Sequence, residues 1–495
     1  MRILFFLLGA FSLLAQTILA REFLSVFFGN EISVGLFYFS WLLFTGLGSA
    51  LALKKKVETP GFSRLLWLAS PLFLLEILLI RSSKLFLDVS SFGGIVPFFQ
   101  LSAAAFIVNL PLPVSLGFLF PNALKFMEDR GSRTGAIFLF EALGTMISGI
   151  LFTYLLIGRF SIVYLILITV LTAVLAKFAF SHYSRQPRQQ LLSLFISVTL
   201  TAALFTPFPR LLETGLSRLS MTEYKGKTVK TLDSRWQRLT LTRYKKQYTV
   251  YANGKVSFSF PDYQDASVLS ALLVSQAKNP ARILLIGQGM GGFLPELLKY
   301  HPQHIDYLEP DPELLGLVKP YLDKTTVRSL QDKRVKIHTQ DGISYLRGLK
   351  AKARYDLILN FSGDPGSAQI NRFYTREFLK ICREHLTGKG VVVSILTSAP
   401  NYLGEELLSY NGSVYATFKQ VFKQVLVLPG DRNIFLATKA ESVLDQDVEE
   451  IKRRYRRYAP QPVERIAQSF GPLMEAGRIK FLGQALAAGT FKINS

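Results

Sequence analysis

The sequence is poor in the side chains that most often bind metals or form covalent cross-links. It contains one cysteine, Cys382, in 495 residues, which excludes an internal disulfide and any metal site built from several cysteines. The five histidines are scattered, and only His301 and His304 lie close together. Their segment has the pattern of a solvated turn between a helix and a strand, so we expect no metal site.

Acidic residues are also scarce. Lysine and arginine number 57 and aspartate and glutamate 35, which gives a formal charge of +22. Hydrophobic residues make up 49% of the chain, and the mean hydropathy is +0.27. Soluble proteins rarely average above zero, so part of the chain is expected in lipid. In such a chain the basic excess indicates cytoplasmic loops and lipid head groups before it indicates nucleic acid.

Apolar stretches in the N-terminal part are candidate membrane spans. Most approach the roughly 20 residues that a helix needs to cross a bilayer, and they lie at 3–20, 32–53, 65–80, 94–121, 135–157, 160–180 and 191–207. The third is short and contains Glu76, whereas the fourth contains Pro111 and Pro113, which predict a broken helix. The first also resembles a signal peptide, but more spans follow it, so we expect a retained helix.

Glu141 is a charged residue inside one of these stretches, in FLFEALG. A carboxylate within an apolar helix is costly enough to be a functional hypothesis. A proton or amine relay is one interpretation, and a hydrogen bond to a neighbouring helix is the other.

The charges between the spans predict their orientation. Alternate loops are rich in basic residues, namely Arg2, Lys54, Lys55, Lys56, Arg64, Lys125, Arg130, Arg133, Arg185 and Arg188, and the other loops carry only Arg21, Arg81, Lys84 and Arg159. The positive-inside rule places the rich set in the cytoplasm. Seven spans would then put everything after Pro207 outside, and one span fewer would leave it inside.

The pattern changes after residue 208. Polar and apolar residues alternate through 228–260, and Asn253-Gly254 is a hairpin signal, which predicts a small antiparallel β unit. From Ala281 short apolar strands alternate with helices, which predicts an α/β, doubly wound Rossmann-like sheet. The expected parts are a multi-span membrane bundle of about seven helices at 1–208, a linker at 209–227, the β unit at 228–262, the α/β domain at 263–440 and a basic helical tail at 441–495.

Ligands of such sheets bind where the parallel strands end, and several informative segments fall there. The glycine loop GQGMGG (287–292) follows the first strand and lets a ligand approach the backbone. Glu309 follows the second strand and can accept both hydroxyls of a ribose. Asp341 follows the third and can accept an exocyclic amine, and Asp364 follows the fourth and can hold a cationic amine. Each signal is weak alone, and their order indicates a nucleoside site.

With these residues in place, the chain resembles the spermidine synthase family, in its bacterial branch with a multi-span membrane region ahead of the aminopropyltransferase domain. The similar segments are REFLSVFFGNE (21–31), FLFEALGTMISG (138–149), SRWQRLTLT (234–242), YANGKVSFSFPDYQDASV (251–268), GQGMGG, LEPDPELL (308–315), QDG (340–342), GDP (363–365) and FYTREFLKICREHLTGKGVVV (373–393). The resemblance implies a class I methyltransferase-type fold for the soluble domain.

The resemblance also implies roles for the matching residues. The co-substrate, decarboxylated S-adenosylmethionine, would be bound by Gln237, Gly287, Gly289, Gly291, Glu309 and Asp341. Tyr263 and Gln264 would face the amine acceptor, and Asp364 would be the catalytic carboxylate. In that family the reaction needs no cofactor and no metal, because the sulfonium of the donor is already a good leaving group.

Two departures from the family pattern bear on the chemistry. Met290 stands where the family's glycine loop has a carboxylate, and Phe361 stands where a second carboxylate precedes Asp364 by three residues. The amine half of the site is therefore expected to be degraded. The alternative function is a transporter or sensor whose soluble domain binds a nucleoside or polyamine without catalysis.

The expected setting is a multi-pass protein of the bacterial inner membrane. Its expected partners are the lipid bilayer, a small amine and the adenosyl donor, with no nucleic acid, and a homo-oligomer is left open. The basic run IKRRYRRY (451–458) follows several acidic residues, so a solvated surface helix or one that faces lipid head groups is expected.

Overall fold

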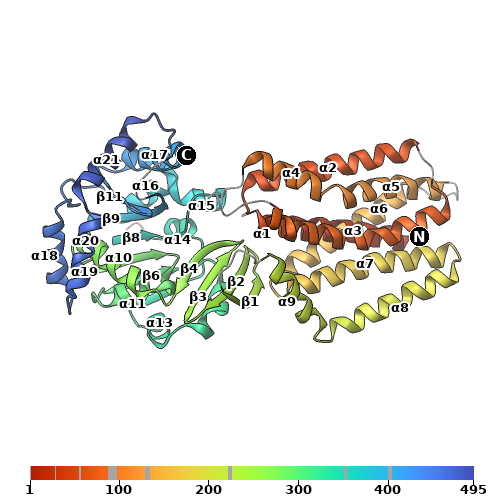
Figure 1. Cartoon of the computed structure of the whole chain (residues 1–495), viewed down its shortest axis with the longest axis horizontal. Helices are drawn as coiled ribbons and strands as arrows, with labels where there is room; N and C mark the ends of the chain where they lie inside the picture. The colour runs from red at the N-terminus through yellow and green to blue at the C-terminus, as the bar shows by residue number, and fades with distance from the viewer. Residues whose placement is uncertain are drawn as a thin grey trace. The chain divides into compact units, whose positions relative to one another are not determined.

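The computed structural model describes residues 2–27, 29–54, 57–86, 97–128, 134–220, 226–349, 354–399 and 404–495. The chain forms two compact units, one of Met1–Thr242 with Tyr251–Lys255 and one of Arg243–Val250 with Val256–Ser495. The first is mainly a bundle of helices, and the second contains the α/β domain (Figure 1).

Apart from the last one, the helices of the first unit follow the predicted apolar stretches. They are α1 (Arg2–Val26), α2 (Glu31–Lys54), α3 (Thr59–Phe86), α4 (Phe98–Val108), α5 (Pro111–Glu128), α6 (Thr134–Leu151), a π-helical segment (Phe152–Leu156), α7 (Ile162–Tyr183), α8 (Pro187–Leu204) and α9 (Phe208–Ser220). Within the described ranges five helices are long and apolar enough to cross a membrane, and α4 with α5, bent by 44°, makes a sixth candidate. The predicted span at 191–207 is helical, as α8, but does not reach that standard.

Small residues let pairs of these helices approach closely. A Cβ atom at Gly144 in α6 would lie 1.9 Å from the carbonyl oxygen of Phe6 in α1. A Cβ atom at Gly48 in α2 would lie 2.2 Å from the carbonyl oxygen of Val114 in α5. Close backbone approach of this kind is the usual way in which apolar helices associate without a hydrophobic driving force.

Helix α8 returns along α7 towards the beginning of that helix. Near its start, Gln189 accepts a hydrogen bond from Lys177 in the last part of α7. Near its end, Leu204 packs on the same apolar cluster as Ile162, the first residue of α7, and Leu212 of α9 joins this cluster. The predicted linker at 209–227 therefore begins as a helix that packs on the bundle, and residues 221–225 lie outside the described ranges.

The predicted β unit is a four-stranded sheet in the order β1-β2-β3-β4, formed by β1 (Lys227–Asp233), β2 (Arg238–Tyr244), β3 (Gln247–Ala252) and β4 (Lys255–Phe260). Asn253 and Gly254 connect β3 to β4 with φ angles of +46° and +83°. Both angles are positive, as a tight hairpin turn with Asn-Gly requires, so the hairpin prediction is confirmed.

The larger sheet has the order β10-β11-β9-β8-β5-β6-β7. Its strands are β5 (Arg282–Ile286), β6 (His304–Leu308), β7 (Val335–His338), β8 (Tyr355–Asn360), β9 (Leu386–Thr397), β10 (Gln424–Leu428) and β11 (Arg432–Thr438). The strands β5 to β9 are parallel, and β11 pairs antiparallel with β9 and with β10. The doubly wound prediction is confirmed, with the correction that the sheet is mixed rather than wholly parallel.

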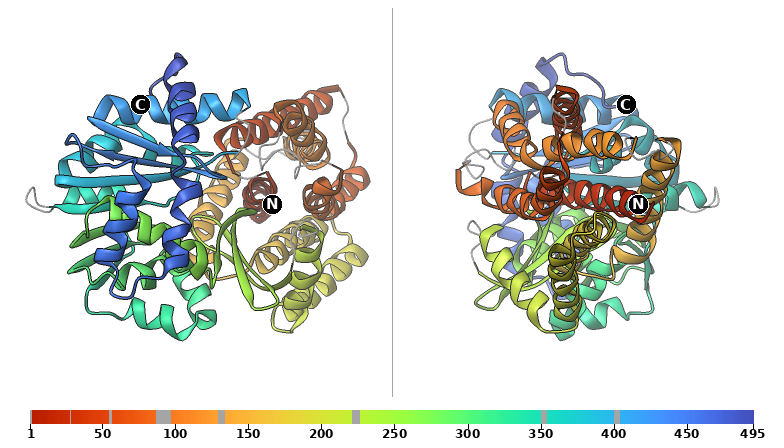
Figure 2. Two further views of the ribbon diagram at one scale, coloured as in Figure 1. Left: turned by 60° about the vertical axis from the view of Figure 1, so that its left-hand side comes forward. Right: turned by 90° about the vertical axis from the view of Figure 1, so that its right-hand side faces the viewer.

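Helices cover both faces of this sheet (Figures 1 and 2). They are α10 (Tyr263–Gln276), α11 (Phe293–Leu298), α12 (Pro312–Val318), α13 (Lys324–Leu330), α14 (Gly342–Gly348), α15 (Ala368–Asn371), α16 (Arg376–His385), α17 (Glu405–Val421), α18 (Val448–Tyr458), α19 (Glu464–Gln468), α20 (Phe470–Leu473) and α21 (Ala476–Ala488). Ile283 and Leu285 of β5 belong to the core cluster with α10, α11 and α18. Leu284 and Ile286 belong to the cluster with α14, α16 and α17. A strand buried on both faces reads as a continuous apolar run, as RILLI does.

The basic tail is part of this domain. Ile451 and Tyr455 of α18 are buried in the core cluster, whereas its basic residues pair with acidic neighbours on the surface. Arg454 contacts Glu450 and Asp445, and Lys452 contacts Glu449. The helix is thus a partly solvated surface helix with one apolar face.

Candidate active site

Backbone hydrogen bonds hold the ends of the central parallel strands together. Gly287, which follows β5, donates to the carbonyl oxygen of Leu308 at 3.0 Å, and Phe361, which follows β8, donates to that of Ile286 at 2.9 Å. Because carboxyl ends of parallel strands meet at one edge of a sheet, this edge receives the predicted segments with Gly287, Glu309, Asp341 and Asp364.

The glycine loop is closely packed against the protein itself. Gly287 and Gly292 have φ angles of +75° and +113°, which residues with a side chain rarely adopt. A Cβ atom at Gly289 would lie 2.7 Å from the ring of Tyr307. Met290 is 1% exposed, so its side chain is enclosed by the protein.

Glu309 is buried at the end of β6. Its carboxylate accepts hydrogen bonds from the hydroxyl of Tyr307 at 3.2 Å and from the backbone N–H of Asp311 at 3.4 Å. Burial raises the pKa of Glu309 to about 7 against the opposing effect of these two bonds. The hydroxyl of Tyr307 also lies beside the backbone N–H groups of Gly289 and Met290. Tyr307, which sequence reasoning treated as an ordinary strand residue, therefore connects the loop to Glu309.

Asp341 caps the N-terminus of α14 and pairs with an arginine. Its Oδ1 accepts from the backbone N–H of Ser344 at 3.0 Å and from the Ser344 hydroxyl at 3.2 Å, and its Oδ2 accepts from Arg372. Arg372 lies in the turn before α16 and was not singled out in the sequence. A carboxylate has about four lone-pair sites, so Asp341 keeps acceptor capacity beyond these bonds.

The carboxylate of Asp364 is bonded by Thr397 of β9. Its Oδ1 accepts from the backbone N–H of Thr397 at 2.8 Å, and its Oδ2 accepts from the Thr397 hydroxyl at 2.5 Å. Tyr374 donates to the carbonyl oxygen of the preceding residue, Gly363, at 2.6 Å. The sequence analysis assigned no role to Thr397 or Tyr374, because their contacts with this turn are made through tertiary packing.

The side chains of Phe361 and its neighbour Asn360 are buried against other residues of the domain. The ring of Phe361 is buried and lies 4.7 Å from the ring of Phe293 between centroids. Asn360 is buried and donates to the carbonyl oxygen of Phe373 and to the hydroxyl of Ser394, both at 3.1 Å. At the position three residues before Asp364 the chain thus places an aromatic ring in the core of the domain.

Tyr263 and Gln264 begin helix α10. The Tyr263 hydroxyl donates to Asp323 at 2.6 Å, and burial together with this bond raises the pKa of Tyr263 to about 12. The side chain of Gln264 is exposed. The adjacent Asp262 lies against the glycine loop, since a Cβ atom at Gly292 would lie 2.9 Å from its carbonyl oxygen. Burial, and then the nearby carboxylate of Asp265, raise the pKa of Asp262.

Two further predicted residues belong to the first unit. Gln237 closes a turn in which Ser234 donates to its carbonyl oxygen at 2.9 Å. Glu141 accepts a hydrogen bond from Thr145, one turn further along the same helix, at 3.4 Å. This bond lies within one helix and is not the predicted bond to a neighbouring helix, so the role of Glu141 stays a prediction.

The sequence reading took His304 as part of a solvated turn, and the structure corrects this. His304 begins β6, and its Nε2 lies 3.1 Å from Asp306, which His338 approaches at 2.8 Å. Tyr355 donates to the same carboxylate at 2.8 Å. Within the described ranges no group of three or more histidine, cysteine, aspartate or glutamate residues is arranged to hold a metal ion.

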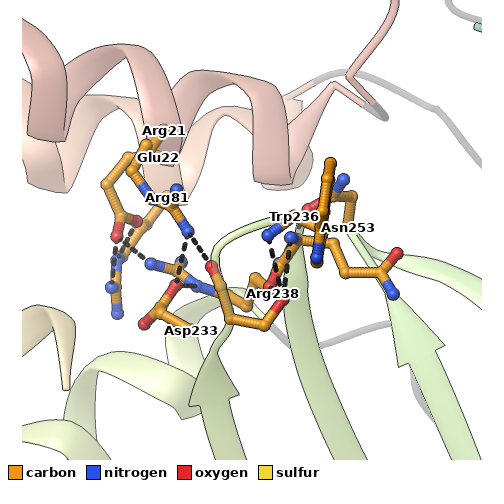
Figure 3. A network of polar contacts seen from close by, with 9 residues as sticks. Arg21, Glu22, Arg81, Asp233, Trp236, Arg238 and Asn253 are labelled. Atoms are coloured by element: carbon orange, nitrogen blue, oxygen red, sulfur yellow. Dashed lines mark hydrogen bonds and ion pairs between the residues drawn. The ribbon is translucent and has the colours of Figure 1, made fainter. Parts of the chain in front are cut away.

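A second polar cluster lies in the first unit (Figure 3) and joins helices to the small sheet. Glu22 of α1 is fully buried and accepts from Arg81 of α3 at 2.7 Å and from Arg238 of β2 at 2.5 Å. Arg238 also donates to Asp233 at 2.9 Å, and Arg21 donates to the carbonyl oxygen of Ser234 at 3.1 Å. Burial alone would lower the pKa of Arg238, but the carboxylates of Asp233 and Glu22 raise it above its usual value.

Comparison with known proteins shows that the α/β domain is similar to a described family. Residues 264–436 match the model of the spermine/spermidine synthase domain. The chain is 23% identical over 420 residues to a polyamine aminopropyltransferase of Oceanobacillus iheyensis, which covers 83% of this chain and 80% of that protein. It is 36% identical over 118 residues to a polyamine aminopropyltransferase of Lachnoclostridium phytofermentans, which covers 23% of this chain and 40% of that protein.

A crystal structure of spermidine synthase from Thermotoga maritima is similar at 21% sequence identity with a TM-score of 0.42, over 53% of this chain and 88% of that chain. Together with the domain match, the curated relatives confirm the resemblance that the sequence motifs predicted.

Proposed function

We propose that this chain, whose C-terminal domain is similar to the spermidine synthase family, transfers an aminopropyl group from decarboxylated S-adenosylmethionine to an amine. The observation that carries the proposal is the placement of Glu309, Asp341 and Asp364 after consecutive parallel strands, beside a glycine loop with two positive φ angles. These are the predicted contacts for ribose, adenine and amine, in that order.

The reaction would be an in-line displacement. The lone pair of the amine nitrogen forms a bond to the aminopropyl carbon next to the sulfonium, and the carbon–sulfur bond breaks. Its electron pair stays on sulfur, which leaves as methylthioadenosine, and the new ammonium loses a proton. The protein's contribution is to desolvate, align and deprotonate the amine, and Asp364 is the proposed carboxylate for the last step.

Two observations support the proposal that the residues for the adenosyl donor are retained better than the residues for the amine. Glu309 and Asp341 stand at the strand ends, whereas Met290 and Phe361, which replace the family's two other carboxylates, are both buried. Asp262, whose backbone carbonyl lies beside Gly292, is a proposed substitute for an amine-binding carboxylate. The named relatives are aminopropyltransferases, so they do not favour the non-catalytic alternative.

The proposal predicts that methylthioadenosine binds more tightly as pH rises to about 7. Only the ionised carboxylate of Glu309 can accept from both ribose hydroxyls, and burial raises its pKa to about 7. Below that pH the proton must be removed before the ligand binds, so affinity should fall by up to about tenfold per pH unit. The measurement is equilibrium binding of methylthioadenosine to the full chain between pH 5.5 and 8.5, values that lie roughly 1.5 units on either side of this pKa.

Glu309→Gln should bind weakly and flatten this profile, and an analogue that lacks both ribose hydroxyls should show no comparable slope. Absence of binding at millimolar ligand, with wild type and Glu309→Gln alike, would remove the nucleoside site and with it the proposed reaction.

Membrane anchoring is the second part of the proposal. Apolar side chains are exposed along the outside of the bundle, among them Leu42, Leu53, Phe99, Phe195 and Phe205. An exposed apolar surface on long helices is unfavourable in water and is what a lipid-facing surface requires. The expected location is the bacterial inner membrane.

We expect residues after the bundle to emerge on the non-cytoplasmic side. Helix α8 runs from Gln189, beside Lys177, towards Ile162 at the beginning of α7, so it returns the chain to the end of the bundle that contains Arg21 and Arg81. The positive-inside rule assigns that end to the non-cytoplasmic side. Of the basic residues in the opposite loops, Lys55, Lys56, Arg130 and Arg133 are not among the described residues. Alkaline phosphatase fused after Arg210 should be active, and a fluorescent protein there should not.

A matched fusion after Gln186, before α8, should give the opposite pattern. If both fusion points report the cytoplasm, α8 does not cross. An outer domain would also draw its adenosyl donor from outside the cytoplasm, so the result bears on which donor pool the domain uses.

A further inference from the structure

A carboxylate and an amide are both buried beside the break between α4 and α5. Glu76 of α3 accepts a hydrogen bond through Oε1 from the backbone N–H of Leu112, in the first turn of α5, at 2.8 Å. Asn109 ends α4, only three positions earlier in the chain. Both Glu76 and Asn109 have 0% exposure. A helix broken in the middle of an apolar bundle is a common way of building an ion site in membrane proteins.

The orientation of the Asn109 amide is fixed by its partners. Its nitrogen donates to the carbonyl oxygen of Phe37 at 3.0 Å and to the hydroxyl of Ser40 at 2.8 Å. Ser40 in turn donates to the carbonyl oxygen of Leu36 at 2.8 Å. Rotating the amide by 180° would place two carbonyl oxygens against each other. Both N–H groups of the Asn109 amide thus donate hydrogen bonds, and its oxygen is the atom that still lacks a donor.

Two buried oxygens at this break have no hydrogen-bond partner among the described residues. They are Oε2 of Glu76 and Oδ1 of Asn109. The nearest cationic residue along α3, Arg81, is bonded to Glu22 instead. Leaving buried acceptors unmet is costly, and more so for a charged group. Both oxygens are pure acceptors when the carboxyl is ionised, so the complementary ligand is a cation that donates hydrogen bonds.

The surroundings of this break favour an organic cation over a bare metal ion. The apolar cluster around it includes Phe37, Phe73, Ile77, Leu101, Ala105 and Leu112, which supplies few further oxygens. Hard metal cations need about six oxygen ligands, whereas a primary ammonium offers three N–H groups and carries methylenes that suit apolar walls. We propose that Glu76 and Asn109 form a binding site for the primary ammonium group of an alkylamine. This site is independent of the function proposed for the α/β domain.

The test is equilibrium binding of labelled n-propylammonium to the full chain in detergent. All proteins carry Asp364→Asn, so that the proposed amine contact of the α/β domain is disabled. Glu76→Gln keeps an acceptor for Leu112 but loses the charge, and we expect affinity to fall at least about tenfold, as for loss of a charged hydrogen bond. Glu213→Gln is the matched control, a carboxylate of α9 in the same unit, and should change affinity less than about twofold.

A competition experiment on protein with native Glu76 keeps the proposal testable if Glu76→Gln folds poorly. Unlabelled n-propylammonium should displace the label, whereas tetramethylammonium, which has the same charge and no N–H group, should not. Equal displacement by both ions would overturn the proposal, as would unchanged binding in Glu76→Gln. Absence of n-propylammonium binding would also overturn it and would indicate that Glu76 holds only a proton.

Discussion

Spermidine formation from putrescine is expected to be at least about a hundredfold slower than in an aminopropyltransferase that has all three family carboxylates, and Asp364→Asn should remove most of what remains. Loss of a general base costs about 10²–10⁴-fold in rate. Here Met290 and Phe361 are buried, so Asp364, bonded to Thr397, is the one carboxylate of the three that is proposed to deprotonate the amine. The measurement is release of methylthioadenosine and spermidine from purified donor and putrescine, followed by chromatography.

Asp356→Asn is the matched control for this experiment. Asp356 lies near the start of β8, the strand that precedes Asp364. Its carboxylate accepts hydrogen bonds from the backbone N–H groups of Ala281 and Arg282, each at 3.0 Å. Its substitution changes one carboxylate of β8 without touching the carboxyl end of the sheet, so turnover should be nearly unchanged. Fast turnover in wild type would mean that other carboxylates, with Asp262 and Asp265 as the candidates, replace the missing pair.

Arg238→Met is expected to lower the stability of the first unit by about 3 kcal/mol. The substitution removes the cation between Glu22 and Asp233 in a cluster where both carboxylates are buried. Glu22 keeps Arg81 and Asp233 keeps Arg21, at 3.8 Å, so the effect should lie at the lower end of the range for breaking a buried ion pair. Thermal unfolding of the full chain in detergent, followed by circular dichroism, is the measurement.

Arg243→Met, which changes an exposed arginine of the same strand, should leave the unfolding midpoint almost unchanged. Glu22→Gln combined with Arg238→Met should recover part of the loss, because neighbouring charges do not contribute additively. If Arg238→Met is as stable as Arg243→Met, the cluster contributes no net stability.

The fold was largely predictable because its signals are local. Apolar runs such as RILLI mark strands buried on both faces, and Asn253-Gly254 marks a turn by its own conformational preference. The prolines Pro111 and Pro113 indicated a broken helix, which the structure places between α4 and α5. The antiparallel pair β10 and β11 was missed, since strand direction depends on pairing with β9 and leaves no mark in the strand's own sequence.

The edge of the sheet that carries the candidate residues was predictable, because it depends only on where the strands end. Glu309 follows β6 directly and Asp364 follows β8 after three residues, so their edge of the sheet could be inferred from order alone. Thr397 and Arg372 contact the site through tertiary packing. Arg81 is a further example. The sequence analysis placed it in a loop between two spans, whereas the structure buries it beside Glu22. Pairing between residues so far apart in the chain has no local pattern.

The contact between Tyr307 and the glycine loop has a kinetic consequence for the proposed donor site. The Tyr307 hydroxyl lies beside the N–H groups of Gly289 and Met290 and donates to Glu309, so it is an internal competitor for groups that a nucleoside would use. The apparent affinity then equals the intrinsic affinity multiplied by the fraction of molecules in which this hydroxyl has moved aside. Donor capture would proceed in two steps, and the observed association rate would level off at high ligand concentration, at the rate of that movement.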